Sequence, residues 1–283
     1  MDLNVLRLTH AIPSQGLWRG AVASLGDELF IAGWKSKGVE VYDTRSPGVI
    51  DFNTFILQRR LIIPGFGLQC LGLAACVYNN CLYASDCDSS SVHRIDLSGS
   101  NAVKKWSVGG GPRGLSVNKA HNVVVVCSGA NKLQEYTTRG SLVREISLQQ
   151  AGLTSPWHAV QLSTGDYVVS QYTFTGVVRV VGVDGQVVCS YDQSQPLNVG
   201  QMNYPASLAV TKDDNILVAD FNNHRILLMN SSLSSSQVLA LSVDNGIRKP
   251  IGLCLDESRG RLYVSEQSRS QRVLIFDSRP VNH

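Results

Sequence analysis

The sequence predicts an all-β fold, a six-bladed β-propeller of four-stranded blades, on three observations. The first is an internal repeat: six segments each begin with a short apolar strand, and they start near residues 18, 70, 112, 156, 205 and 250. The second is the period, since the starts lie 52, 42, 44, 49 and 45 residues apart, as is typical of propeller blades. The third is that no segment has the apolar spacing of an amphipathic helix.

Each repeat is long enough to hold four strands. In the fifth repeat we predict them at 205–211, 215–220, 224–230 and 237–243. Polar turns such as 163–166 (STGD) and 212–215 (KDDN) lie between apolar runs, which is typical of β-hairpins. Six blades account for nearly every residue, so we expect residues 1–283 to form a single propeller domain.

The sixth repeat lacks a fourth strand, because the sequence ends at His283 soon after the third. An apolar segment at 4–9 (NVLRLT) is available near the other end of the sequence. We expect this segment to pair as the outer strand of the sixth blade, because closing the ring in this way removes two unpaired sheet edges.

Composition and charge exclude several classes of protein. Hydrophobic residues make up 43% of the chain and charged residues 17%, which is a globular composition. No apolar stretch reaches the roughly 18 residues of a membrane span, and no secretory signal is recognisable. The seven cysteines are odd in number and form no CxxC pair, so we expect a reduced, cytoplasmic chain. Since a propeller closes on itself, we also expect a monomer.

The last two repeats carry the most specific motifs. In the fifth these are 205–210 (PASLAV), 215–220 (NILVAD) and 222–226 (NNHRI), and in the sixth they are 250–253 (PIGL), 261–266 (RLYVSE) and 271–274 (QRVL). They resemble NHL repeats, the six-bladed propeller module that ends many tripartite-motif proteins. The other repeats keep the strand rhythm but lose landmarks, since Ser128 stands where the fifth repeat has Asp220.

The resemblance implies a binding platform for protein partners or for RNA, without a cofactor. Tripartite-motif proteins carry RING, B-box and coiled-coil segments ahead of the propeller. This sequence contains none of those segments, so ubiquitin-ligase activity does not follow from the resemblance.

We expect the binding surface on the face formed by the loops between second and third strands and by the segments that enter each blade. The opposite face holds acidic hairpins, so this polarity would orient an anionic partner. A solvated surface without a binding role is the alternative. The candidate partner-binding residues are Trp34, Lys35, Lys37, Arg113, Lys132, His158, Tyr172, Phe174, His224, Arg248 and Arg269.

Aromatic residues in this surface have two interpretations. Tyr172 and Phe174 lie in a polar loop of the fourth repeat, where they would anchor a peptide or stack on a base. They would equally well cover the joint between neighbouring blades. Trp34 has the same two interpretations.

His158 stands out when the six first strands are aligned. Five of the six equivalent positions hold small residues, as expected where backbones approach closely around a central channel. We expect the imidazole at the channel mouth, where it would contact a ligand or donate to a phosphate. A hydrogen bond to the neighbouring blade is the alternative that we favour. The aligned residues are Gly20, Gly72, Gly114, His158, Ser207 and Gly252.

Other charged and thiol groups are expected to have structural roles. Asp220 with Arg225, and Glu266 with Arg272, lie at strand ends, where we expect them to tie loops together. The fourth strands carry basic residues that we expect to guard sheet edges, namely Arg7, Arg59, Arg60, Lys104, Lys105 and Arg144. One repeat holds cysteines whose spacing suits no common zinc site, and we expect these to be buried, namely Cys70, Cys76, Cys81 and Cys87.

Three function classes remain, and we favour protein interaction over RNA binding and over catalysis. Some six-bladed propellers are lactonases, hydrolases or lyases that hold a metal ion in the channel. At the entrances of the six first strands no carboxylate occurs, so we expect no metal there. The loop face offers only modest positive charge for RNA. The entrance residues are Arg19, Leu71, Arg113, Trp157, Ala206 and Ile251.

Overall fold

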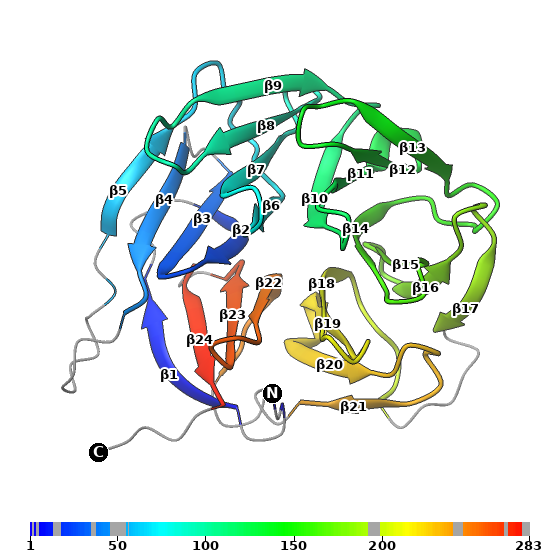
Figure 1. Ribbon diagram of the computed structural model, residues 1–283. Helices are drawn as coiled ribbons and strands as arrows, with labels where there is room; N and C mark the ends of the chain where they lie inside the picture. Colours follow the sequence, from blue (N-terminus) through cyan, green and yellow to red (C-terminus); the bar gives the residue numbers. More distant parts are fainter. Residues whose placement is uncertain are drawn as a thin grey trace.

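The chain folds into six four-stranded antiparallel sheets that stand around a central axis (Figure 1). The computed structural model describes residues 1, 3, 6–13, 18–34, 38–45, 55, 57–191, 199–239, 246–268 and 271–278. The predicted all-β six-bladed propeller is confirmed. No helix within these ranges is long and apolar enough to cross a membrane.

Each blade runs from an inner strand near the axis to an outer strand at the rim. Blade one contains β2 (Trp18–Leu25), β3 (Glu28–Trp34), β4 (Gly38–Asp43) and β5 (Leu57–Ile62). Blade two contains β6 (Leu73–Cys76), β7 (Cys81–Asp86), β8 (Ser91–Asp96) and β9 (Val103–Ser107). Blade three contains β10 (Pro112–Val117), β11 (Val123–Cys127), the 3₁₀ helix η2 (Ser128–Ala130), β12 (Lys132–Tyr136) and β13 (Leu142–Ser147).

The second half of the ring follows the same plan. Blade four contains β14 (Pro156–Gln161), β15 (Tyr167–Gln171), β16 (Val177–Val181) and β17 (Val187–Tyr191). Blade five contains β18 (Pro205–Val210), β19 (Ile216–Asp220), η3 (Phe221–Asn223), β20 (Arg225–Met229) and β21 (Ser236–Val238). Blade six contains β22 (Pro250–Asp256), β23 (Arg261–Glu266), β24 (Val273–Asp277) and β1 (Arg7–Ile12).

The ring is closed by the amino-terminal strand, as predicted. Strand β1 pairs antiparallel with β24 and completes the sheet β1-β24-β23-β22, so the two lie side by side in Figure 1. The predicted bounds of 4–9 are wrong, because the strand spans Arg7–Ile12. Leu3 and Leu6 are instead buried in the apolar cluster between blades five and six. They pack into a joint rather than extend the ladder.

Apolar side chains fill the six joints between neighbouring blades, one cluster to each joint. Every residue of β7, β11, β15 and β19 is buried. These second strands are covered on both faces, so apolar residues follow one another without alternation, and polar residues stand only near the strand ends.

The inner strands bend where they approach the axis. In five of the six blades the register between first and second strands shifts near the strand start, for example between Pro156 and His158. In blade two the pairing begins at Leu73, so the predicted start near residue 70 is wrong for the strand itself. There the Ser85 hydroxyl accepts the Gly72 N–H at 2.8 Å, in place of a ladder bond.

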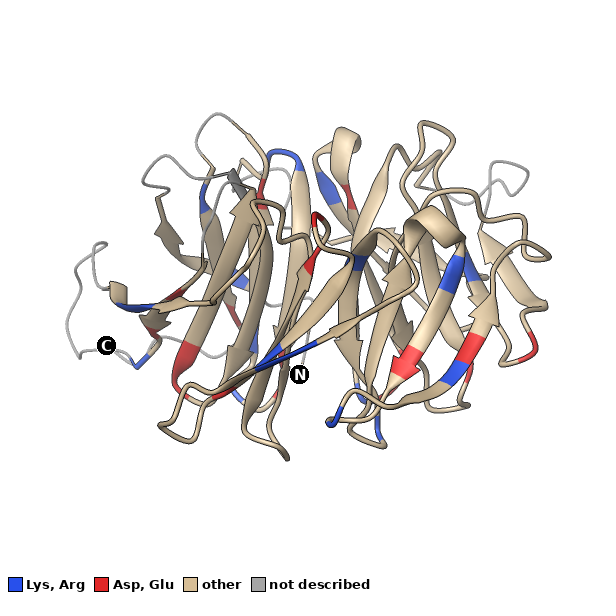
Figure 2. Ribbon diagram, turned by 90° about the horizontal axis from the view of Figure 1, so that it is seen from above, with Lys and Arg blue, Asp and Glu red and all other residues tan. Residues whose placement is uncertain are grey.

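The rim carries the predicted basic residues on its outer strands. Arg59 pairs with Glu28, and Arg144 lies 3.0 Å from Glu135, each within its own blade. Basic and acidic residues are mixed around the disc in Figure 2, without a continuous basic band. These pairs support the interpretation that rim cations protect sheet edges.

The cysteines are all free thiols. Cys76 and Cys81 lie opposite each other across the β6–β7 hairpin, and both are buried, as is Cys70. Cys87 is partly exposed, and burial raises the pKa of its thiol to about 12. The thiol of Cys87 is therefore protonated at neutral pH, and the prediction of structural cysteines is confirmed for the buried three.

Candidate functional site

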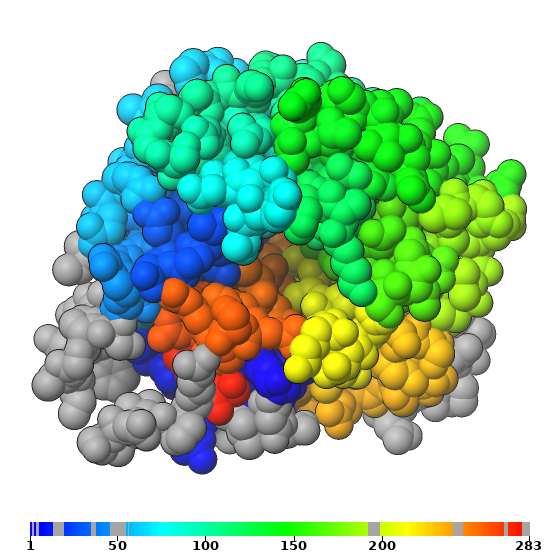
Figure 3. Space-filling view, viewed as in Figure 1, coloured from blue at the N-terminus to red at the C-terminus, as the bar shows by residue number. Residues whose placement is uncertain are grey.

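The inner strands enclose a central channel of about 470 Å³. Figure 3 shows it as a hollow where the blades meet. A Cβ atom at Gly72 would lie 2.2 Å from the carbonyl oxygen of Arg113, and one at Gly114 would lie 2.7 Å from that of Trp157. Such contacts are too short for any side chain, so the predicted close approach of inner strands is confirmed at these positions.

The channel wall is largely apolar and offers few ligating groups. Its described carboxylates are Asp256 and Glu257, at the end formed by the hairpins. Glu257 accepts the Lys212 N–H at 2.8 Å, and Asp256 accepts the Ser258 hydroxyl at 2.6 Å. Within the described ranges no group of three His, Cys, Asp or Glu side chains is close enough to hold a metal ion.

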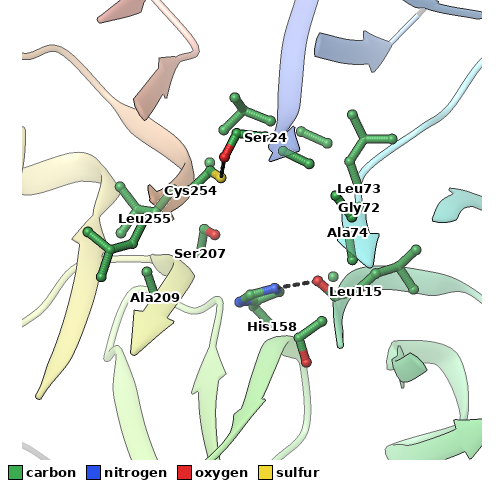
Figure 4. A pocket seen from close by; sticks show the side chains of 18 of the residues that line it. Ser24, Gly72, Leu73, Ala74, Leu115, His158, Ser207, Ala209, Cys254 and Leu255 are labelled. Atoms are coloured by element: carbon green, nitrogen blue, oxygen red, sulfur yellow. Dashed lines mark hydrogen bonds between the residues drawn. The ribbon is translucent and has the colours of Figure 1, made fainter. Parts of the chain in front are cut away.

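His158 lies inside the channel and ties three blades together (Figure 4). Its Nε2 lies 3.0 Å from the Leu115 carbonyl oxygen, and its Nδ1 lies 3.0 Å from the Leu208 N–H. The Leu208 N–H must donate, so Nε2 carries the proton and donates to Leu115. The favoured hydrogen bond to a neighbouring blade is confirmed. Neither nitrogen is left to donate to a phosphate.

Burial lowers the pKa of His158 below the ordinary value for histidine. The folded protein therefore holds this ring neutral at a pH where the unfolded chain already binds a proton. The contribution of His158 to the free energy of unfolding is therefore fully present above the unfolded pKa of about 6.5. It decreases as the pH falls below that value. We expect the melting temperature to decrease from pH 7.5 to pH 5, and to decrease less in His158→Gln, whose amide does not titrate. An equal decrease in both proteins would contradict this role of His158, and an NMR titration of its Cε1–H reports the pKa directly.

Blade two contains a serine, a histidine and an aspartate that do not form a catalytic triad. Asp86 Oδ2 lies 3.3 Å from His93 Nε2, and the Ser91 hydroxyl lies 3.4 Å from the same nitrogen. A triad needs the acid and the nucleophile on different ring nitrogens. His93 and Asp86 are also fully buried. Asp86 accepts the Gly67 N–H at 3.1 Å and the Ser89 N–H at 3.2 Å, so the group ties the segment that enters the blade to the loop after β7.

Strand-end acids on the loop face tie loops together, as predicted, and they are also buried. Asp220 accepts the Asn203 N–H at 2.8 Å and pairs with Arg225 at 2.7 Å. Glu266 pairs with Arg272 at the same distance. Asp86, at the end of β7, is a third strand-end acid, and all three lie wholly inside the protein. None of these three carboxylates is therefore exposed on the loop face.

The predicted site residues fall into different surroundings. Lys132 is neutralised by Glu145 at 2.7 Å. Trp34 ends β3, is 45% exposed and bridges to Gln69, whereas Phe174 is 63% exposed. Three of the predicted residues lie outside the described residues, namely Lys35, Lys37 and Arg269.

Arg113 and Tyr172 belong to a chain of cations and rings. The Arg113 guanidinium carbon lies 4.6 Å from the Trp157 ring centroid, and Tyr172 stacks on Trp157 at 4.3 Å. Tyr172 also meets the edge of Phe221 at 5.7 Å, and the Lys249 Nζ lies 5.4 Å from the Phe221 centroid. We call these five residues the cation–aromatic arc. It crosses the loop face from blade three to blade six.

The contacts of Tyr172 decide between its two interpretations, a partner anchor and a cover for the joint between blades. Its ring lies between Trp157 of blade four and Tyr204 and Phe221 of blade five, and burial raises its pKa to about 12. Tyr172 therefore covers the joint between these blades. The candidate partner-binding residues included neither Phe221 nor Lys249, although both occupy positions at a blade entrance or strand end, as Arg113 does.

Comparison with known proteins identifies one repeat. The family model described as the NHL repeat matches the segment that holds β18, β19, η3 and the start of β20. Residues 202–227 match the NHL repeat. No curated protein matches the chain significantly.

Solved structures agree with the β-propeller fold. Virginiamycin B lyase from Staphylococcus aureus is 11% identical, with a TM-score of 0.68 over 96% of this chain and 99% of that one. A hydrazine synthase chain from Kuenenia stuttgartiensis is 16% identical, with a TM-score of 0.64 over 94% and 97%. A chain of a nidogen/laminin complex is 15% identical, with a TM-score of 0.63 over 85% and 86%. At these identities the likeness concerns the fold alone.

The NHL repeat has a clear structural basis in blade five. Its Asp220 and Arg225 join the end of β19 to the start of β20, and the Arg225 Nη1 donates to the Val199 carbonyl oxygen at 2.6 Å. Blade six repeats the arrangement with Glu266 and Arg272. The acid and base landmarks of the NHL repeat therefore act as loop anchors in this protein.

Proposed function

We propose that the protein is a non-catalytic binding platform that takes a protein or peptide partner on the loop face around the channel. The observation that carries this proposal is the cation–aromatic arc. Arg113 and Lys249 at its ends, and Arg248 beside it, make no ion pair with any carboxylate in the described ranges. Charges that the fold leaves unpaired are available to a partner, and arginine beside aromatic rings is enriched at energetically important contacts.

The test is affinity capture from cell extract with matched charge variants. We expect Arg113→Glu combined with Arg248→Glu to abolish capture of the proteins that the wild type retains. Lys119→Glu combined with Lys212→Glu makes the same charge change at exposed hairpin positions on the opposite face, and we expect capture to persist. Melting curves show whether each variant is folded. Capture that survives the first double change would place the site elsewhere.

RNA binding through the same cations is the alternative function. Titration with a random RNA pool at roughly 50 and 200 mM salt decides it, since binding that relies on phosphate neutralisation weakens steeply with salt. Micromolar binding with that salt dependence would favour RNA. The lyase structures among the similar folds give catalysis as a third class of function, and no described group of three His, Cys, Asp or Glu side chains favours a metal-dependent form of it.

A further inference from the structure

A cleft opens on the loop face between blades five and six. One wall is formed by Phe221 and His224 after β19, and the other by 246–249 and by residues that follow β23. Its volume is about 990 Å³. His224, Arg248 and Lys249 are exposed at its surface.

The basic residues of the cleft are held in place through their backbone. The Lys249 N–H donates to His224 Nδ1 at 3.0 Å, and the Lys249 carbonyl oxygen accepts the Gln267 N–H at 2.9 Å. The Arg248 N–H donates to Glu266 Oε1 at 2.6 Å. His224 and Lys249 both have left-handed backbones, with φ of 56° and 50°. Non-glycine residues keep such conformations only where their surroundings fix them, often at binding sites.

No described acid neutralises this cleft. Glu266, whose carboxylate contacts the cleft residue Arg248, is fully buried and shares its oxygens between the Arg248 N–H and the Arg272 guanidinium. Arg272 also donates to the Gly246 carbonyl oxygen at 2.8 Å. The pair therefore fixes the loop 246–249 while the side chains of Arg248 and Lys249 keep their positive charge.

The cleft is continuous with the cation–aromatic arc, since Lys249 and Phe221 belong to both. At the far end of the arc Arg113 supplies a second site of positive charge. The links of the arc are 4.3 to 5.7 Å each. An extended peptide rises about 3.3 Å per residue, so roughly six residues would span the arc.

We propose that the loop face binds an extended acidic peptide, with carboxylates of the peptide in the cleft at Arg248 and Lys249 and a further carboxylate at Arg113. This inference rests on the proposed function and names the chemistry of its partner. The apolar stretch between the carboxylates lies over the half-buried rings of Tyr172 and Tyr204. Charge-assisted hydrogen bonds at both ends fix the direction of the peptide.

The arc favours a peptide over single-stranded RNA. Bases bind such surfaces by stacking on open ring faces. Trp157 has Tyr172 and the Arg113 guanidinium over its ring, and Phe221 is flanked by Tyr172 and Lys249. Trp157 and Phe221 are only 9% and 8% exposed. Trp157 and Phe221 thus position cations and leave no open ring face for a base to stack on.

The test uses fluorescence anisotropy with the full chain and a labelled peptide. The peptide has two neighbouring aspartates, four alternating leucines and alanines, and one further aspartate. A matched peptide with asparagine for each aspartate, and a ten-nucleotide uridine RNA, are the comparison probes. We expect the acidic peptide to bind at least tenfold more tightly than either, since tenfold corresponds to about 1.4 kcal/mol and a single charge-assisted hydrogen bond contributes as much.

Two variants place the peptide on the surface. We expect the double change Arg248→Gln with Lys249→Gln to weaken binding of the acidic peptide by tenfold or more. We expect the same loss of affinity from Arg113→Gln alone. Lys119→Gln with Lys212→Gln should leave its affinity within about twofold, because these residues lie on the opposite face. Equal binding of the acidic and amide peptides, preference for the RNA, or unchanged affinity in the cleft variant would each overturn the inference.

This result is separable from the test of the proposed function. If a partner is captured through Arg113 and Arg248 but the protein does not prefer the acidic peptide, the proposed binding platform is supported and the acidic-peptide inference is contradicted. If the wild-type chain neither captures a protein through Arg113 and Arg248 nor binds the acidic peptide, both proposals are contradicted.

Discussion

Deletion of residues 1–12 is expected to lower the melting temperature by roughly 10 °C or more. The deletion removes β1, which pairs with β24 from Arg7 to Ile12. It also removes Leu3, Leu6 and Ile12 from buried positions. Each buried apolar side chain contributes about 2–5 kcal/mol, and about 1 kcal/mol corresponds to 2–4 °C in a protein of this size. Differential scanning calorimetry at fixed pH measures the change.

Two controls separate strand pairing from the loss of an arbitrary segment. Deletion of residues 1–5 removes Leu3 but keeps β1, so its effect should be clearly smaller. Arg7→Ala changes an exposed side chain and should shift the melting temperature by no more than about 1 °C. A full deletion that melts like the intact chain would contradict closure of the ring by β1. We also expect the deletion to promote aggregation, because it leaves the edge of β24 unpaired.

The fold was predictable because its determinants are periodic along the sequence. Strand rhythm, turn composition and the missing fourth strand of the sixth repeat together specify blade number and closure. The bounds of β1 were not predictable in the same way. Leu6 is apolar, as a strand residue would be, so the sequence alone does not separate it from β1. Only the folded structure shows that its side chain packs in the joint between blades five and six and that the strand begins at the next residue.

The channel shows which contacts a sequence can specify. Alignment of the first strands singled out His158, and its bond to a neighbouring blade was anticipated. Its second bond was not, because the Leu208 N–H becomes available only where the bulge in β18 breaks the ladder. A bulge is set by the twist and crowding of strands around the axis, and these are properties of the closed ring.

The loop face shows the reverse situation, in which the residues were known and their exposure was not. Asp220 and Glu266 look like surface acids at strand ends, and a count of charges sets them against Arg113 and Arg248. In the folded chain both acids turn inward to accept backbone N–H groups and an arginine. Burial of the acids leaves the neighbouring cations as the dominant charge of the described cleft.

Glu266→Ala is expected to destabilise the protein by about 3–5 kcal/mol, because it leaves the partly buried Arg272 without its carboxylate. The pair has a contact of 2.7 Å, and the Glu266 side chain is fully buried. The substitution also removes the acceptor of the Arg248 N–H. We therefore expect weaker binding at the cleft even where the variant remains folded. Urea unfolding gives the change in free energy, and anisotropy with the acidic peptide gives the change in binding.

Glu145→Ala is the matched control, because Glu145 also forms an ion pair at 2.7 Å, with Lys132, but is 40% exposed. Exposed pairs contribute about 0–1 kcal/mol, so the two glutamates should differ by at least 2 kcal/mol. Glu266→Gln should fall between them, since its amide oxygen still accepts the Arg248 N–H while the charge is lost. Equal costs for Glu266→Ala and Glu145→Ala would show that the strand-end acids do not anchor the loop, and the preorganised cleft that depends on them would lose its basis.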